Sequence, residues 1–148
     1  MHLSHRGESW GMGEDDAYRT WEMQQNDVTT RDAVWSLTAY RKSCYLQEIA
    51  WPDVCRLTRV RVTRSVSDQL YDALGSICAN ISEGFSRSSA RDRCRMYEYA
   101  LGSARESVAW YRGARPVLGR ELVAARHALL QEIIRLLLKM LRTDRGQR

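Results

Sequence analysis

The stretch Asn80-Ile81-Ser82-Glu83-Gly84 stands between two segments of helical periodicity. Before it, apolar residues recur at steps of three and four, which is the spacing of one face of an amphipathic helix. These residues are Val66, Leu70, Ala73, Ile77 and Ile81. Glycine tolerates the left-handed conformation that commonly ends a helix, so we expect Gly84 to end this one.

A second helix is predicted after the polar turn Ser86-Arg87-Ser88-Ser89. Ser88 or Ser89 can accept a hydrogen bond from an orphan backbone N–H and so cap its first turn. The apolar residues of this helix alternate steps of three and four, as in a heptad seam. They are Cys94, Tyr97, Leu101, Ala104, Val108 and Tyr111. Two amphipathic helices joined by a short turn form an antiparallel helical hairpin.

The residues of this hairpin resemble a known family. The matching positions are Gln69-Leu70, Ala73, Ser76-Ile77, Asn80-Ile81, Glu83-Gly84, Arg87, Ser89, Ala100, Gly102-Ser103 and Glu106. The pattern is similar to that of the proteins encoded by intervening sequences of bacterial 23S ribosomal RNA genes. Weaker similarity extends over about residues 33–142.

The resemblance implies an up-and-down four-helix bundle that assembles as a homopentamer with basic surfaces. It also implies a distant relation in fold to the accessory protein of diversity-generating retroelements, which partners a reverse transcriptase and its RNA. The chain departs from the family in one respect, because Tyr71 and Asp72 stand where the family usually has a basic pair. A nucleic-acid role that depends on that pair does not carry over.

Two further helices complete a predicted all-α fold. The first spans about residues 30–50 and ends at Trp51-Pro52-Asp53, because proline lacks an amide donor and disfavours helix in the residue before it. The hairpin then begins near Ser65 and closes at Arg115-Pro116. The last helix spans about residues 120–142.

The last helix has more apolar surface than one core-facing stripe requires. Its surplus, which includes Leu138, indicates contact with another subunit. Gly102 and Ser103 in the preceding helix indicate close approach of a neighbour, since glycine costs about 1 kcal/mol against alanine inside a helix. We therefore expect an antiparallel four-helix bundle over residues 29–142 in a cyclic homo-oligomer, and by the resemblance a pentamer.

The two ends of the chain lie outside this bundle. Residues 1–28 are acidic and without a clear period, so we expect an irregular arm, whose Trp10, Trp21 and Met23 are available to dock on the bundle or on a neighbouring subunit. Residues 143–148 form a short basic tail. The first residues lack the apolar run of a signal peptide, and no apolar stretch reaches the ~20 residues that span a bilayer. We expect a soluble, cytoplasmic protein that does not contact a membrane.

Positive charge is concentrated after the arm. Residues 1–33 hold three arginines against seven acidic residues, whereas residues 34–148 hold 20 basic residues against 11 acidic ones. Only Lys42 and Lys139 are lysine, and the other 21 basic residues are arginine. Arginine binds phosphate oxygens bidentately and stacks on bases, which suits nucleic acid. A GC-rich genome would produce the same bias without a function.

Arginines also follow one line along the third helix. Positions 91, 95, 98, 102, 105, 109 and 112 flank the apolar seam, and four of the seven are arginine while only Glu98 is acidic. We call Arg91, Arg95, Arg105 and Arg112 the arginine stripe. It is roughly 30 Å long at 1.5 Å per residue. The stripe is either a solvated helix face or, as we predict from its scarcity of acids, a surface for phosphate contacts.

A second basic group precedes the hairpin, where the stretch 57–63 follows no single period. We call Arg56, Arg59, Arg61 and Arg64 the arginine cluster and predict that it also contacts phosphate. The turn residues Asn80, Glu83 and Gly84 have a structural interpretation, in which Asn80 bonds backbone groups and Glu83 pairs with Arg87. The alternative is that this turn faces a ligand or RNA.

No pattern here indicates an enzyme. His127 is the only histidine in the predicted bundle and has no acid at hydrogen-bonding spacing, and the Glu-x-x-His repeats of a di-iron bundle are absent. The four cysteines form no C-x-x-C pair and are expected to be small buried side chains in a reducing cytosol. We expect no catalytic site, metal or cofactor. The leading hypothesis is binding of structured RNA or DNA, and the alternative is a protein scaffold or an accessory subunit of a reverse transcriptase.

Overall fold

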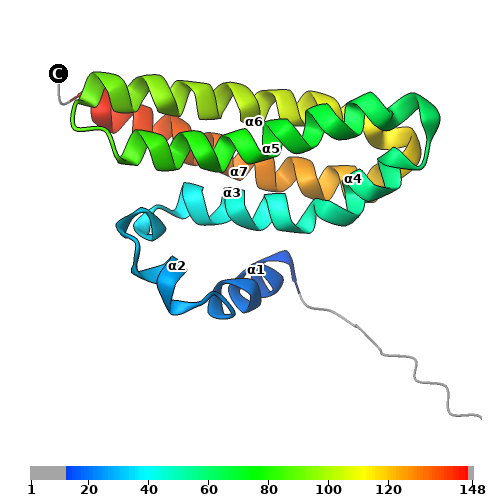
Figure 1. The fold of residues 1–148 in the computed structure, drawn as a ribbon, viewed down its shortest axis with the longest axis horizontal. Helices are drawn as coiled ribbons and strands as arrows, with labels where there is room; N and C mark the ends of the chain where they lie inside the picture. Colours follow the sequence, from blue (N-terminus) through cyan, green and yellow to red (C-terminus); the bar gives the residue numbers. More distant parts are fainter. Residues whose placement is uncertain (1–12, 147–148) are drawn as a thin grey trace, which may run out of the picture.

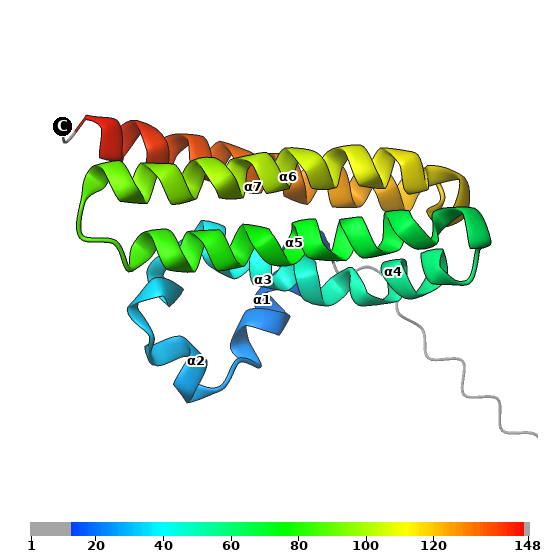
Figure 2. The same ribbon diagram turned by 45° about the horizontal axis from the view of Figure 1, so that its top comes forward.

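The computed structural model describes residues 13–146, and within them every regular element is helical. The elements in chain order are α1 (Glu14–Met23), α2 (Asp27–Arg31), η1 (Ala33–Ser36), α3 (Thr38–Ile49), α4 (Trp51–Thr58), η2 (Arg61–Thr63), α5 (Arg64–Phe85), α6 (Ala90–Leu118) and α7 (Arg120–Arg145). Four columns, with α3 and α4 following one another in the first, lie side by side along the long axis (Figures 1 and 2). This arrangement fits a helical bundle.

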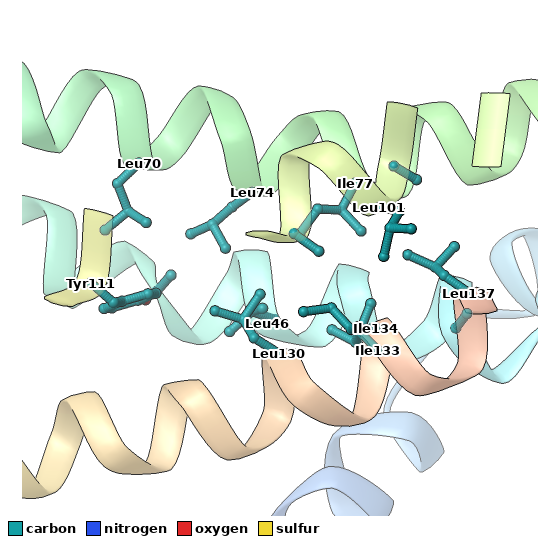
Figure 3. Packing of buried hydrophobic residues seen from close by; sticks show 14 of the residues in the cluster. Leu46, Leu70, Leu74, Ile77, Leu101, Tyr111, Leu130, Ile133, Ile134 and Leu137 are labelled. Carbon is teal, nitrogen blue, oxygen red and sulfur yellow. The ribbon is translucent and has the colours of Figure 1, made fainter. Parts of the chain in front are cut away.

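The core lies where the apolar faces of these columns meet. Side chains from α3, α5, α6 and α7 converge on one cluster (Figure 3). The predicted faces of α5 and α6 both point into it: Leu70, Ala73, Ile77 and Ile81 are buried, as are Cys94, Tyr97, Leu101, Ala104 and Tyr111. Val66 and Val108 pack at its edge.

The α5–α6 turn differs from the prediction in one respect. Ser89 caps α6 as expected, because its Oγ accepts a hydrogen bond from the backbone N–H of Asp92 at 3.1 Å. Gly84, however, does not have the predicted left-handed conformation; among residues 13–146 only Gly119 has a positive φ, of 91°. Gly84 lies buried inside α5, where an added Cβ would come within 2.6 Å of the Tyr97 ring. Glycine is needed there for close approach of α6.

Both prolines lie within helices, but only Pro116 departs from the prediction, since α3 ends at Ile49 before Pro52 as expected. Pro52 does interrupt the first column, but α4 begins at once with this proline in its first turn, where the missing N–H has no intrahelical partner in any case. Pro116 does not end α6, which continues to Leu118 and ends at Gly119. Because Pro116 lies in the last turn of α6, its missing N–H removes only one hydrogen bond from the helix.

The predicted first helix is divided. Asp32 is extended and accepts a hydrogen bond from the backbone N–H of Val34, which separates α2 from η1. Leu37 is extended as well, so the continuous helix of this region begins only at Thr38. The helical period of α3 therefore does not extend back to residue 30.

The arm is not irregular where the structure describes it. α1 packs against α3 (Figure 2), and Trp21 is 9% exposed in an aromatic cluster with Tyr18, Trp35 and Tyr45. The Trp21 indole also donates to Glu48 Oε2 at 2.6 Å. Docking of Trp21 supplies the apolar contact that the local sequence lacks. Trp10 lies outside the described residues, as does the rest of the arm up to residue 12.

The basic tail is also partly helical. α7 continues through Arg145, three residues beyond the predicted end. Asp144 explains the extension, because its Oδ1 lies 3.0 Å from Arg93 Nη2 on α6 and fixes the last turn of α7 against α6. Residues 147–148 are outside the described part of the chain.

Candidate nucleic-acid interface

The arginine stripe lies on the outer side of α6. All four arginines of the stripe are exposed, because the apolar seam beside them occupies the face of α6 that packs against the core. α6 runs without interruption for 29 residues, so the four side chains follow one helix axis. Within residues 13–146 none of the four is in a salt bridge. Their positive charge is therefore directed to solvent.

Glu98, the one acidic residue on the line of positions that contains the arginine stripe, pairs with an arginine of α7. Glu98 Oε1 lies 2.7 Å from Arg145 Nη2, and both side chains are about half exposed. Such an exposed pair adds little stability. Because Arg145 compensates the negative charge of Glu98, that charge does not cancel the positive charge of the neighbouring arginines.

Arg95 lies beside an exposed aromatic ring. Its Nε donates to the Tyr99 hydroxyl at 3.0 Å, and its guanidinium carbon lies 5.8 Å from the ring centroid. Tyr99 is 48% exposed. The stripe thus offers a cation together with a ring on which a base can stack.

The arginine cluster lies at the end of the molecule where α4 passes into α5. Arg56 belongs to α4, Arg59 and Arg61 follow it, and Arg64 opens α5; all four are exposed. Arg56 Nη2 donates to the Val117 carbonyl at 2.8 Å, which ties α4 to the last turn of α6. The cluster and the Arg112 end of the stripe therefore share one end of the molecule (Figure 1). No cluster residue is in a salt bridge with any residue from 13 to 146.

Four other basic residues, Arg41, Lys42, Arg93 and Arg126, have structural partners and do not belong to this surface. Arg41 Nε lies 2.5 Å from Glu22 Oε1 and holds α1 on α3. Lys42 is 8% exposed, and its Nζ lies 2.9 Å from a carboxylate oxygen of Glu132. Arg93 and Arg126 pair with acids on other helices. Sequence periodicity alone does not separate these residues from the exposed arginines.

The predicted turn residues have mainly structural contacts. Asn80 Nδ2 donates to the Ser76 carbonyl at 2.8 Å within α5. Glu83 pairs with Arg87, as the structural interpretation expected. The Ser103 carbonyl accepts from Ser107 Oγ at 2.8 Å. Gly102 has no neighbour within 4 Å of an added Cβ, so no helix of this chain approaches it closely among the described residues.

Sequence reasoning missed a buried polar network. Asp53, 1% exposed at the start of α4, accepts from Arg126 Nε at 2.8 Å and from the Tyr111 hydroxyl at 2.9 Å. Burial raises the pKa of the Tyr111 hydroxyl, and the Asp53 carboxylate raises it further. The only local signal was an acid among the apolar residues after Pro52. The network joins α4, α6 and α7 and has the features of a structural element.

Two other kinds of feature are absent from the described residues. No group of three His, Cys, Asp or Glu side chains between residues 13 and 146 is placed to hold a metal ion. In the same range, no helix combines the length and apolar character needed to cross a membrane.

Comparison with known proteins adds one match. The family model described as 23S rRNA-intervening sequence protein matches residues 36–141, which include both the arginine stripe and the arginine cluster. No curated protein and no solved structure matches the chain significantly.

Proposed function

Because this chain belongs to the family of 23S rRNA-intervening sequence proteins, we propose that it is a non-catalytic protein that binds structured RNA through phosphate contacts. The observation that carries the proposal is the arginine stripe, in which four exposed guanidinium groups without an acidic partner among residues 13–146 follow one helix. A guanidinium group matches phosphate oxygens with two parallel hydrogen bonds. The arginine cluster supplies a second set of cations at the Arg112 end.

Binding through phosphates determines how selective the protein is for RNA sequence. Phosphate contacts position a nucleic acid but carry no sequence information directly. We therefore expect little preference for RNA sequence. We also expect DNA to bind the same arginines, but more weakly than RNA whose loop bases add stacking contacts. The family name supports RNA as the physiological class.

We also propose that the chain acts as a homo-oligomer, with the pentamer that the resemblance implies. Leu138 on α7 supports this, because it is 39% exposed on a helix whose inner face is already filled by Leu130, Ile133 and Leu137. Trp51 is 57% exposed on another helix. Each added subunit repeats the arginine stripe, which multiplies the phosphate contacts available to one RNA.

Salt titration of the wild-type protein tests the proposal. We expect two fully paired RNA duplexes of about 16 base pairs and of unrelated sequence to bind with similar affinity. Log affinity should fall linearly with log salt concentration, by roughly 0.7 to 0.9 per phosphate contact. Failure to bind either RNA at about 50 mM salt would overturn the proposal. An acidic protein surface, such as that of a reverse transcriptase, would then be the partner to test.

A further inference from the structure

An open pocket lies at the other end of the molecule, beside the α5–α6 turn. The end of α5, the start of α6 and the end of α7 lie at this end of the molecule (Figure 1). Residues of these three segments line the pocket together with Leu37, the residue before α3. Its volume is about 380 Å³, which is within the ~300–1,000 Å³ of ligand pockets. Neither the arginine cluster nor the buried Asp53 network contributes to it.

The floor of the pocket is apolar and aromatic. Phe85, the only phenylalanine in the chain, is 36% exposed there, and Tyr97 and Met140 lie beside it in the lining. A single exposed apolar side chain is common on protein surfaces, but Phe85 lines this pocket together with the apolar side chain of Met140 and the ring of Tyr97. The pocket therefore offers a surface for a flat apolar group.

The rim of the pocket carries three basic side chains, Arg87, Arg93 and Lys139, and one acid, Asp144. Arg87 pairs with Glu83, which lies outside the lining. Asp144 is already held by Arg93, with N–O distances of 3.0 and 3.1 Å. Lys139 is exposed and has no salt bridge within residues 13–146. A ligand that fits both rim and floor combines a flat apolar part with negative charge.

The arginine stripe begins at the same end of the molecule as this pocket. Arg91 lies in the first turn of α6, four residues after Arg87 in the rim. Arg93 and Tyr97 line the pocket from the opposite side of α6, so an RNA backbone that follows the stripe reaches the pocket by passing around the N-terminus of α6. Proteins recognise RNA largely through unpaired bases that leave the stack and pack on aromatic side chains.

We propose that this pocket binds one unpaired nucleobase of an RNA whose phosphates lie on the arginine stripe. The base packs on Phe85 and Met140, and Lys139 contacts the phosphates beside it. This inference rests on the proposed function and adds to it a preference for RNA with bulged or looped nucleotides over fully paired RNA.

Two duplexes that differ only by a single bulged nucleotide test this inference. We expect wild-type protein to bind the bulged RNA at least about five-fold more tightly, which is the lower end of the effect of stacking one base on an aromatic side chain. Phe85→Ala should reduce the affinity for the bulged RNA to that for the paired duplex and leave the latter unchanged. Circular dichroism checks that this variant is folded.

Lys139→Glu provides a second variant that does not disturb the core, because Lys139 is exposed. It should weaken binding of the bulged RNA more than binding of the duplex. Arg135→Glu is its matched control, since Arg135 is exposed one turn earlier on α7 and does not line the pocket; it should leave the ratio of the two affinities unchanged.

The outcomes separate this inference from the proposed function. Equal binding of both RNAs by wild-type protein would overturn the inference that the pocket binds a base, and the proposal of phosphate binding would still stand. A preference for the bulged RNA that persists in both pocket variants would also overturn it. Binding of neither RNA would overturn the proposed function, and the pocket with it.

Discussion

Arg126 Nε on α7 lies 2.8 Å from Oδ2 of Asp53, which is 1% exposed in the first turn of α4. The same guanidinium group donates from Nη2 to the Ile49 carbonyl at 3.2 Å, just before α4 begins. Burial alone would lower the pKa of Arg126, but the hydrogen bond and charge of Asp53 raise it. Arg126 therefore stays charged inside the molecule, and its contacts connect the two halves of the first column to α7.

Removing one partner of this pair is expected to be costly. Asp53→Ala leaves the charge of Arg126 buried without compensation and should lower the free energy of unfolding by about 3–5 kcal/mol. Asp27→Ala is the matched control, because Asp27 and Arg31 form a salt bridge whose side chains are 86% and 81% exposed. That control should cost at most about 1 kcal/mol. Urea denaturation measures both, and equal losses would show that the buried pair does not form.

Two glycines of the hairpin, Gly84 and Gly102, should respond oppositely to alanine. Gly84→Ala places a Cβ 2.6 Å from the Tyr97 ring and 3.0 Å from Met96 Cβ, and such overpacking should destabilise by about 1–3 kcal/mol. Gly102→Ala meets nothing within 4 Å and should stabilise α6 by about 0.5–1 kcal/mol. Thermal unfolding of the two variants decides the matter. A stabilised Gly84→Ala protein would contradict close packing of α5 on α6.

The arginine stripe should act through charge and not through stability. Arg95→Gln with Arg105→Gln should weaken binding to unrelated RNAs about equally, and each phosphate that is no longer bound should lower the salt slope by roughly 0.7 to 0.9. The change is multiplied if the subunits of an oligomer bind the same RNA. Arg19→Gln with Arg135→Gln removes the same charge from exposed positions on α1 and α7. If that control pair lowers the slope as much, the stripe is not the binding surface, and the arginine cluster is the next to test.

The exposed Leu138 predicts a defined assembly. Wild-type protein at micromolar concentration should scatter light as a species several times larger than the 17.1 kDa chain. Leu138→Arg should dissociate it while circular dichroism keeps the same helical signal. Val28→Arg is the control, because Val28 is 85% exposed on α2 and away from α7. A wild-type species of 17.1 kDa would refute the oligomer.

High pH should loosen the attachment of α1. Burial raises the pKa of Tyr18 to about 12, compared with about 10 for an unperturbed tyrosine. The folded protein thus holds this proton more tightly than the unfolded chain does. The resulting stabilisation is complete below about pH 10 and is lost as the pH rises toward 12. The urea midpoint should fall across this range, and it should fall less in Tyr18→Phe; identical slopes would contradict a buried Tyr18 hydroxyl.

Local periodicity in the sequence determined the helices of the hairpin and their buried faces. Leu70, Ile77, Tyr97 and Leu101 are buried because residues three and four apart share one side of any helix, whatever packs against it. The exposure of the arginine stripe follows from the same geometry, since the stripe flanks the seam. The capping role of Ser89 needs only the residues of its own turn.

Tertiary structure alone decided the features that depend on residues far apart in the chain. Position 84 must be glycine because the Tyr97 ring of the next helix leaves no room for a side chain. Trp21 is held in place by the rings of Trp35 and Tyr45. Asp53 is matched by a guanidinium group 73 residues later. The pocket at Phe85 exists because the end of α7 reaches the α5–α6 turn. Contacts of this kind arise from the packing of whole helices, so they leave no period in the sequence from which they could be predicted.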